Sequence, residues 1–349
     1  MCVFEAFSAE REKREAVFKW ERKTEMTEAR KRFKKIGITT GMLSGFTYGL
    51  YTTFVLIAGY YKPLAGAVGL FAAPYVTSGL NDFFAGLWLT AYNIKTGRIK
   101  EIGRSLRLFP GKVILIGSLV GGPIASGAYL MGLAMAGAYA IPISAMYILF
   151  GALFARIFLK QKIVPRVGAG MLICVVGAIV INWVKPEGST NFTLGIICAF
   201  VAAIGWALEG VFAAYGSAML DTDVVINIRQ LLSGIVDLFV ILPLLGGFGL
   251  LKMTLFTMPP VMWLLLSGLC AATSYLCWYK SNSTIGCAVG MSLNITYAFW
   301  GVLFCILFLK QPVTPTIVIG SVIIILGAIL VSVNPLEMLK KEEETSNEV

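Results

Sequence analysis

Three acidic residues lie inside long apolar stretches of the chain: Asp82, Glu209 and Asp237. A carboxylate at the centre of a membrane-spanning helix costs roughly 2.5–3.5 kcal/mol, so such a residue usually faces a cavity or a partner group. These three side chains are therefore predicted to bind a proton or a cationic group. Ser78 and Ser233, one turn before the two aspartates, support a second interpretation, in which each Asp hydrogen-bonds a neighbouring helix and holds the bundle together.

Aromatic and amide side chains at helical spacing extend this candidate site. Trp206 precedes Glu209 by one turn and is predicted to stack on a bound substrate. Tyr147 in one apolar stretch, and Asn294 with Tyr297 in another, occupy equivalent places and are predicted either to line the pathway or to bridge helices. Weaker candidates for the same pathway are Tyr48, Tyr51, Tyr129, Ser274 and Tyr275.

The chemistry that the sequence lacks narrows the function. Arg156, Arg229 and Lys280 are placed near the ends of apolar stretches, so no cation is expected at mid-membrane and phosphorylated substrates are disfavoured. The chain has no His, and its seven Cys form no C-x-x-C pair. We therefore expect no metal site and no cofactor. An integral-membrane enzyme is disfavoured as well, because the sequence has no nucleophile motif and no acidic pair at catalytic spacing.

The composition places these residues in a membrane. Of the 349 residues, 57% are hydrophobic and 14% charged, against about 45–50% and about 25% in soluble domains. Apolar stretches long enough to cross a bilayer, about 20 residues each, recur along the chain. We expect ten membrane-spanning helices, at 36–60, 67–92, 111–135, 138–159, 167–184, 193–218, 228–248, 259–279, 284–309 and 313–333.

The basic residues predict the orientation. With the N-terminus inside the cell, all 29 Lys and Arg fall in cytoplasmic segments except Lys62, Lys185, Lys252 and Lys310. This bias fits the positive-inside rule and predicts that both termini are cytoplasmic. The net charge of +10 is thus explained by the membrane, and we expect no nucleic-acid partner.

The polar segment 1–35 lacks the apolar core of a signal peptide. We expect a solvated, partly helical cytoplasmic arm, with lipid-headgroup binding as the alternative. Met26 begins a plausible start, so residues 1–25 are expected to be dispensable. Five helices at 36–184, five more at 193–334 and a cytoplasmic tail at 335–349 complete the expected organisation.

An internal repeat relates the two groups of five helices. Residues 151–181 align without gaps to 301–331, with 13 identities in 31 positions, including Phe-Leu-Lys-Gln at 158–161 and 308–311. A second match, at an offset of 155, pairs 78–84 with 233–239 and therefore Asp82 with Asp237. Because each unit has an odd number of helices, the second unit enters the membrane inverted, as in many secondary transporters.

The pattern Gly-x-Leu-Phe-x3-Phe-Leu-Lys-Gln, followed by Pro and a Gly-rich last helix, occurs in both units. It resembles the half-repeat of the drug/metabolite transporter superfamily, in its ten-helix EamA-type branch. The family commonly has Glu where this chain has Gln161 and Gln311, which leaves the substrate open.

The resemblance implies a secondary transporter in the cell membrane that moves a small organic metabolite, such as an amino acid, by alternating access. Proton-coupled export of cationic drugs or amines is the alternative. The implied partners are the substrate, protons in the second case, and the lipid bilayer. The oligomeric state is open between a monomer and a homodimer.

Overall fold

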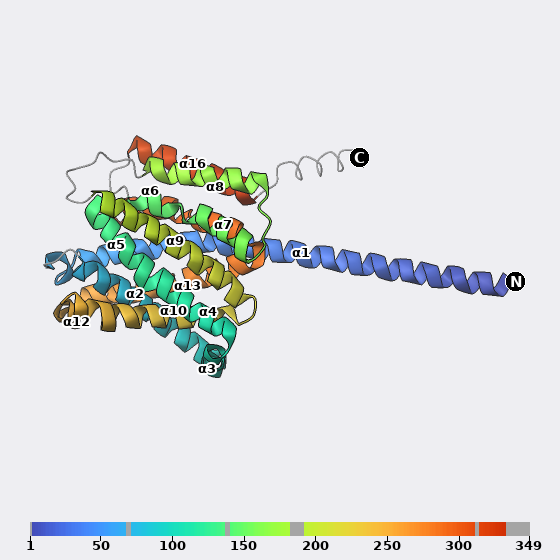
Figure 1. Cartoon of the computed structure of the whole chain (residues 1–349), viewed down its shortest axis with the longest axis horizontal. Helices are drawn as coiled ribbons and strands as arrows, with labels where there is room; N and C mark the ends of the chain where they lie inside the picture. The colour runs from blue at the N-terminus through green and yellow to red at the C-terminus, as the bar shows by residue number, and fades with distance from the viewer. Residues whose placement is uncertain (1, 68–70, 137–139, 182–191, 311–313, 333–349) are drawn as a thin grey trace.

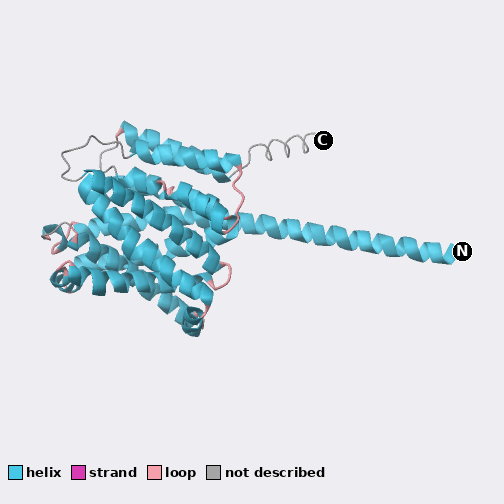
Figure 2. Cartoon of the chain, viewed as in Figure 1, coloured by secondary structure: helices cyan, strands magenta, loops and turns pink. Residues whose placement is uncertain are grey.

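The computed structural model describes residues 2–67, 71–136, 140–181, 192–310 and 314–332. Regular secondary structure in these ranges is entirely helical, which confirms the all-α prediction for them (Figure 2). The tail 335–349 and most of the connection between the two groups of helices lie outside the described residues. In chain order the elements are α1 (Cys2–Gly59), η1 (Leu64–Gly66), α2 (Ala72–Lys95), α3 (Ile99–Arg107), α4 (Phe109–Leu119), η2 (Val120–Ile124), α5 (Ala125–Ala136), α6 (Ala140–Ala145), α7 (Tyr147–Phe158), α8 (Pro165–Ile181), α9 (Phe192–Ser217), α10 (Thr222–Val236), η4 (Asp237–Ile241), α11 (Leu242–Leu244), α12 (Phe248–Leu255), α13 (Met258–Ile285), α14 (Cys287–Asn294), α15 (Tyr297–Leu309) and α16 (Pro315–Ser332).

Within the described ranges, six helical stretches are long and apolar enough to cross a membrane: Lys31–Gly59, Phe109–Gly132, Phe192–Ser217, Thr222–Leu244, Met258–Ile285 and Cys287–Leu309. Three shorter apolar helices, Ile143–Phe158, Pro165–Val180 and Pro315–Val331, accompany them. The helix α2 has 24 residues and carries the polar pair Asn81 and Asp82 near its centre.

The N-terminal arm and the first predicted span form a single helix, α1, which projects from one end of the bundle (Figure 1). The boundary expected at residue 35 therefore does not interrupt the helix. The sequence explains this continuity, because no Pro or Gly occurs before Gly37 to end a helix.

Two helices change to π-helical turns near a proline. In one, α4 passes through η2, which contains Pro123, into α5. In the other, α10 passes through η4, which begins at Asp237, into the short α11 with Pro243. A proline removes a backbone donor from the helix, and π turns are frequent at functional sites.

The helices α8 and α16 lie side by side along one edge of the bundle (Figure 1). Glycines allow this contact: a Cβ at Gly177 would lie 2.8 Å from the carbonyl oxygen of Gly320, and a Cβ at Gly327 would lie 2.9 Å from that of Gly170. In the repeat with an offset of 150, residue 170 is equivalent to 320 and residue 177 to 327. Each of the two contacts is therefore the counterpart of the other.

The helices α2 and α10 show the same reciprocity. A Cβ at Gly79 would lie 2.7 Å from Leu238 Cδ2, and a Cβ at Gly234 would lie 2.5 Å from Phe83 N. The offset of 155 exchanges these contacts. The turns after α7 and α15 also match, since Lys160 and Lys310 both adopt the left-handed conformation, with φ of 53° and 52°.

Three serines of α13, spaced by seven residues, fasten this helix to α1. Their hydroxyls donate to main-chain carbonyls of α1, and we call Ser267, Ser274 and Ser281 the α13 serines. Ser267 bonds Tyr51 O at 3.1 Å, Ser274 bonds Ser44 O at 2.9 Å, and Ser281 bonds Gly37 O at 2.8 Å. The carbonyls are also spaced by seven residues, so the two helices run in opposite directions with matched registers.

Candidate functional site

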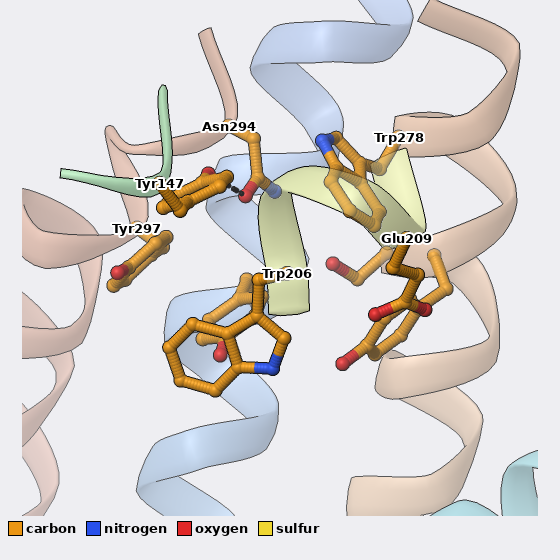
Figure 3. Close-up of a pocket in the computed structure, with 9 residues that line it drawn as sticks. Tyr147, Trp206, Glu209, Trp278, Asn294 and Tyr297 are labelled. Carbon is orange, nitrogen blue, oxygen red and sulfur yellow. Dashed lines mark hydrogen bonds between the residues drawn. The ribbon is translucent and has the colours of Figure 1, made fainter. Parts of the chain in front are cut away.

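An aromatic-lined cavity lies where α1, α7, α9, α13, α14 and α15 meet (Figure 3). Its lining residues are Tyr48, Tyr147, Trp206, Glu209, Ser274, Tyr275, Trp278, Asn294 and Tyr297. Six of them are aromatic and one is a carboxylate. Its volume is about 30 Å³, room for water molecules but not for an organic molecule. A larger substrate therefore requires these side chains to move apart.

The rings pack against one another to form the walls of this cavity. Tyr48 stacks on Tyr297 with 4.3 Å between ring centroids. Trp206 lies 5.2 Å from Tyr129 and meets Tyr147 edge-on at 6.4 Å. These separations are typical of favourable aromatic pairs, so the walls are held by the same rings that face the cavity.

Polar groups at the rim are bonded to the surrounding helices. Tyr147 OH donates to Asn294 Oδ1 at 2.9 Å (Figure 3), and Asn294 Nδ2 donates to Ser44 Oγ at 2.7 Å. Trp206 Nε1 donates at 3.0 Å to the carbonyl of Gly121, in the π turn η2. Trp278 Nε1 is buried without a hydrogen-bond partner in the described part of the chain.

A buried ion cluster adjoins the cavity. The Arg229 side chain, 1% exposed, donates from Nε to Glu209 Oε1 and from Nη1 to Asp82 Oδ2, each at 2.7 Å. Nη1 also donates to Gln230 Oε1 at 2.7 Å. The guanidinium lies over the Tyr275 ring, 4.3 Å from its centroid. Two carboxylates thus share one guanidinium, which leaves the cluster with a net negative charge.

Comparison with known proteins gives a family for the second half of the chain. Residues 193–333 match the EamA-like transporter family. These residues form an EamA-like transporter domain. The resemblance stated from the sequence is thereby confirmed, and a multi-pass membrane transporter of small molecules agrees with the apolar helices.

Two further proteins are similar to this chain. Protein LicB of Haemophilus influenzae is 27% identical over 217 residues, which are 62% of this chain and 73% of LicB. A protein of known crystal structure superposes with a TM-score of 0.64 at 18% identity, covering 86% of this chain and 97% of the other. At that identity the second likeness shows the fold alone.

Most of the predicted site residues come together in the structure. Trp206, Glu209, Tyr147, Asn294 and Tyr297 all line the cavity. Of the weaker candidates, Tyr48, Ser274 and Tyr275 line it too. Trp278 was missed by sequence reasoning, although it lies one turn after Ser274 on the same apolar helix.

The two aspartates that are equivalent by repeat have different surroundings. Asp82 does not line the cavity but reaches it through Arg229. Asp237 begins the π turn η4 and is 1% exposed, and its Oδ1 has no hydrogen-bond partner in the part of the chain that the structure describes. One aspartate is therefore ion-paired, and the other has an unpaired carboxylate oxygen.

The expectation that no cation lies within the spans was wrong. It rested on a helix beginning at residue 228, which put Arg229 at the helix end. The helix α10 begins at Thr222, so Arg229 lies two turns inside it and is buried. Asp221 immediately before the helix is a residue type favoured at the N-cap and signals this start. The argument against phosphorylated substrates loses its basis.

A half-buried ion pair joins the loop after α2 to the start of α10. Arg98 Nη1 donates to both carboxylate oxygens of Asp223, at 2.8 and 2.7 Å. Asp223, followed by Asp221, raises the pKa of Arg98 above its usual value. This pair lies outside the cavity and offers a control position for substitutions.

Among the described residues, no group of three His, Cys, Asp or Glu side chains is arranged to hold a metal ion.

Proposed function

We propose that the protein is a secondary transporter that moves a small organic cation across the membrane by alternating access. The observation that carries this proposal is the cavity with six aromatic side chains and Glu209. Aromatic faces attract cations through their quadrupole, and aromatic cages recognise alkylated ammonium groups. A carboxylate beside the rings supplies the balancing charge.

Two further observations bear on the chemistry of the substrate. The cluster of Asp82, Glu209 and Arg229 carries a net negative charge, which favours a cation over an amino acid with its own carboxylate. Trp278 Nε1, a donor without a hydrogen-bond partner among the described residues, lies beside the cavity and suits an oxygen atom on the substrate.

For the architecture, we propose ten membrane-spanning helices in two inverted units of five. The six long stretches and three shorter helices are joined by α2, whose polar pair lowers its hydropathy. The reciprocal contacts of α8 with α16 and of α2 with α10 are those expected of a two-fold axis that relates the units. The shared left-handed conformation of Lys160 and Lys310 supports the same relation.

The inverted arrangement predicts opposite labelling of two equivalent lysines. Lys160→Cys and Lys310→Cys, each in a Cys-free background, are expected to react with a membrane-impermeant thiol reagent from opposite sides: position 160 from the cytoplasm and position 310 from outside. Labelling of intact cells and inverted vesicles measures this. Reaction of both positions from the same side contradicts the inversion.

The same proposal places the protein in the cell membrane with both termini in the cytoplasm. The end of the bundle from which α1 projects also carries the helix α3, which has Arg104 and Arg107 in its last turn (Figure 1). The partners are then the organic cation, the lipid bilayer and, for coupled transport, protons.

Uptake by reconstituted vesicles tests the substrate class. We expect saturable uptake of tetramethylammonium or ethylammonium, inhibited by either compound. Uncharged tert-butanol and zwitterionic alanine should not compete, because they lack the net positive charge that Glu209 and the rings select. Transport of alanine with no effect of the ammonium compounds contradicts the cation proposal and restores the amino-acid interpretation. Runs with and without a pH gradient measure coupling to protons.

A further inference from the structure

The side chain of Arg229 uses the cavity's own binding groups. Its Nε is bonded to Glu209 and its plane covers Tyr275, and both residues line the cavity. A carboxylate and an aromatic face are the two groups that a substrate cation needs. The protein therefore already holds one cation of its own at the proposed site.

Two other contacts of Arg229 lie outside the cavity lining, while its Nη2 donates to Tyr275 OH at 3.4 Å. Nη1 is bonded to Asp82 and to Gln230, neither of which lines the cavity. The guanidinium can therefore release Glu209 and keep two bonds, with its charge still balanced by Asp82. Because Arg presents its donors in a fixed fork, it can hold two acceptors at once or one of them alone.

The size of the cavity fits an empty transporter. With about 30 Å³ of space, the rings are closed together while Arg229 is paired with Glu209. Binding of an organic cation has to move the rings apart. The positive charge of the substrate then competes with Arg229 for Glu209.

We propose that Arg229 is a tethered cation: it takes the place of the substrate at Glu209 and Tyr275 in the empty transporter and gives both up when an organic cation binds. This inference rests on the proposed function. A buried carboxylate without a partner is costly, so Arg229 lets the empty transporter change conformation without a counter-ion. Arg229 thus lowers the affinity for the organic cation and raises its net flux.

Substitution of Arg229 by Gln separates these two effects. Without the competing guanidinium, tetramethylammonium is expected to bind about tenfold more tightly, since a unit charge a few ångströms away acts strongly in a protein interior. Exchange between labelled and unlabelled tetramethylammonium should persist. Net downhill flux should fall by about tenfold, because Glu209 in the empty transporter keeps the hydrogen bond from Tyr279 OH at 3.1 Å but loses the cation that balances its buried charge.

Three further variants control for charge and folding. Asp82→Asn/Arg229→Gln keeps the net charge of the cluster and should show the same tighter binding and loss of net flux. This double variant tests the proposed role of Arg229 if Arg229→Gln alone does not purify. Arg229→Lys keeps the charge but not the fork, so its affinity should lie between wild type and Arg229→Gln. Arg98→Gln removes a guanidinium outside the cavity and should leave affinity unchanged.

The results separate this inference from the proposed function. If the wild-type protein neither binds nor transports ammonium compounds, the proposed function fails. If it does, the tethered cation is overturned by unchanged or weaker binding in the Arg229→Gln and double variants. It is equally overturned if exchange and net flux fall together in the variants that fold, since Arg229 is then a structural tie.

Discussion

Replacing Glu209 with Gln is expected to lower the uptake of an organic cation at sub-saturating concentration by about 100-fold or more. Removal of one partner of a buried charge pair costs roughly 2–5 kcal/mol, and each 1.4 kcal/mol is a factor of ten. The loss has two physical sources. The cavity loses its lining carboxylate, and Arg229 is left beside the rings with one bond fewer and a charge that repels the substrate.

Initial rates in reconstituted vesicles, together with calorimetric binding, measure this effect. Glu101→Gln is the matched control, because Glu101 lies on α3 outside the cavity and pairs only with exposed Arg104 among the described residues. Glu209→Gln/Arg229→Gln removes both charges and should recover part of the binding through the aromatic faces. An affinity of Glu209→Gln equal to that of the wild-type protein shows that the substrate charge is bound elsewhere.

Asp82→Asn and Asp237→Asn are expected to behave differently, although the repeat makes the two positions equivalent. Asp82→Asn removes one of the two carboxylates that hold Arg229, so we expect a loss of stability of about 3 kcal/mol. Asp237→Asn keeps the side-chain volume and removes a buried carboxylate whose Oδ1 has no partner among the described residues, so it should insert and purify normally. Stimulation of transport by a pH gradient should disappear in Asp237→Asn, while exchange at saturating substrate persists.

Thermal unfolding in detergent and paired flux assays distinguish these outcomes. If Asp237→Asn leaves the pH-driven flux unchanged, Asp237 carries no coupling proton. Equal thermal stability of Asp82→Asn and the wild-type protein shows that the ion pair with Arg229 is not a significant tie. The first outcome leaves Asp237 with the structural interpretation that the sequence also allowed, and the second removes that interpretation for Asp82.

The aromatic and acidic part of the site was predictable because its residues interrupt apolar stretches. Glu209 and Trp206 share one face of a single helix, and Asn294 and Tyr297 lie one turn apart. Side chains of this kind at membrane depth need a cavity or a partner, which the sequence alone indicates. Their convergence from six helices needed the tertiary structure.

The ion cluster could not be predicted from the repeat. At the offset that pairs Asp82 with Asp237, the position equivalent to Arg229 is Pro74. The sequence alignment matches the two carboxylates but gives Arg229 no basic counterpart, and Arg229 bonds Asp82. A similar sequence setting therefore gave one paired and one unpaired carboxylate oxygen. The ten spans and their inversion follow from the sequence pattern and stay predictions.

The α13 serines have a consequence for movement. Their step of seven residues corresponds to about 10.5 Å along a helix at 1.5 Å per residue. Sliding α13 along α1 by a single turn breaks all three bonds and forms none of the same kind, so intermediate positions are penalised. Since α1 and α13 come from different units, this seam joins the two halves at a fixed register. We therefore expect the pair to tilt as one rigid body, with the pathway opening along other helix contacts.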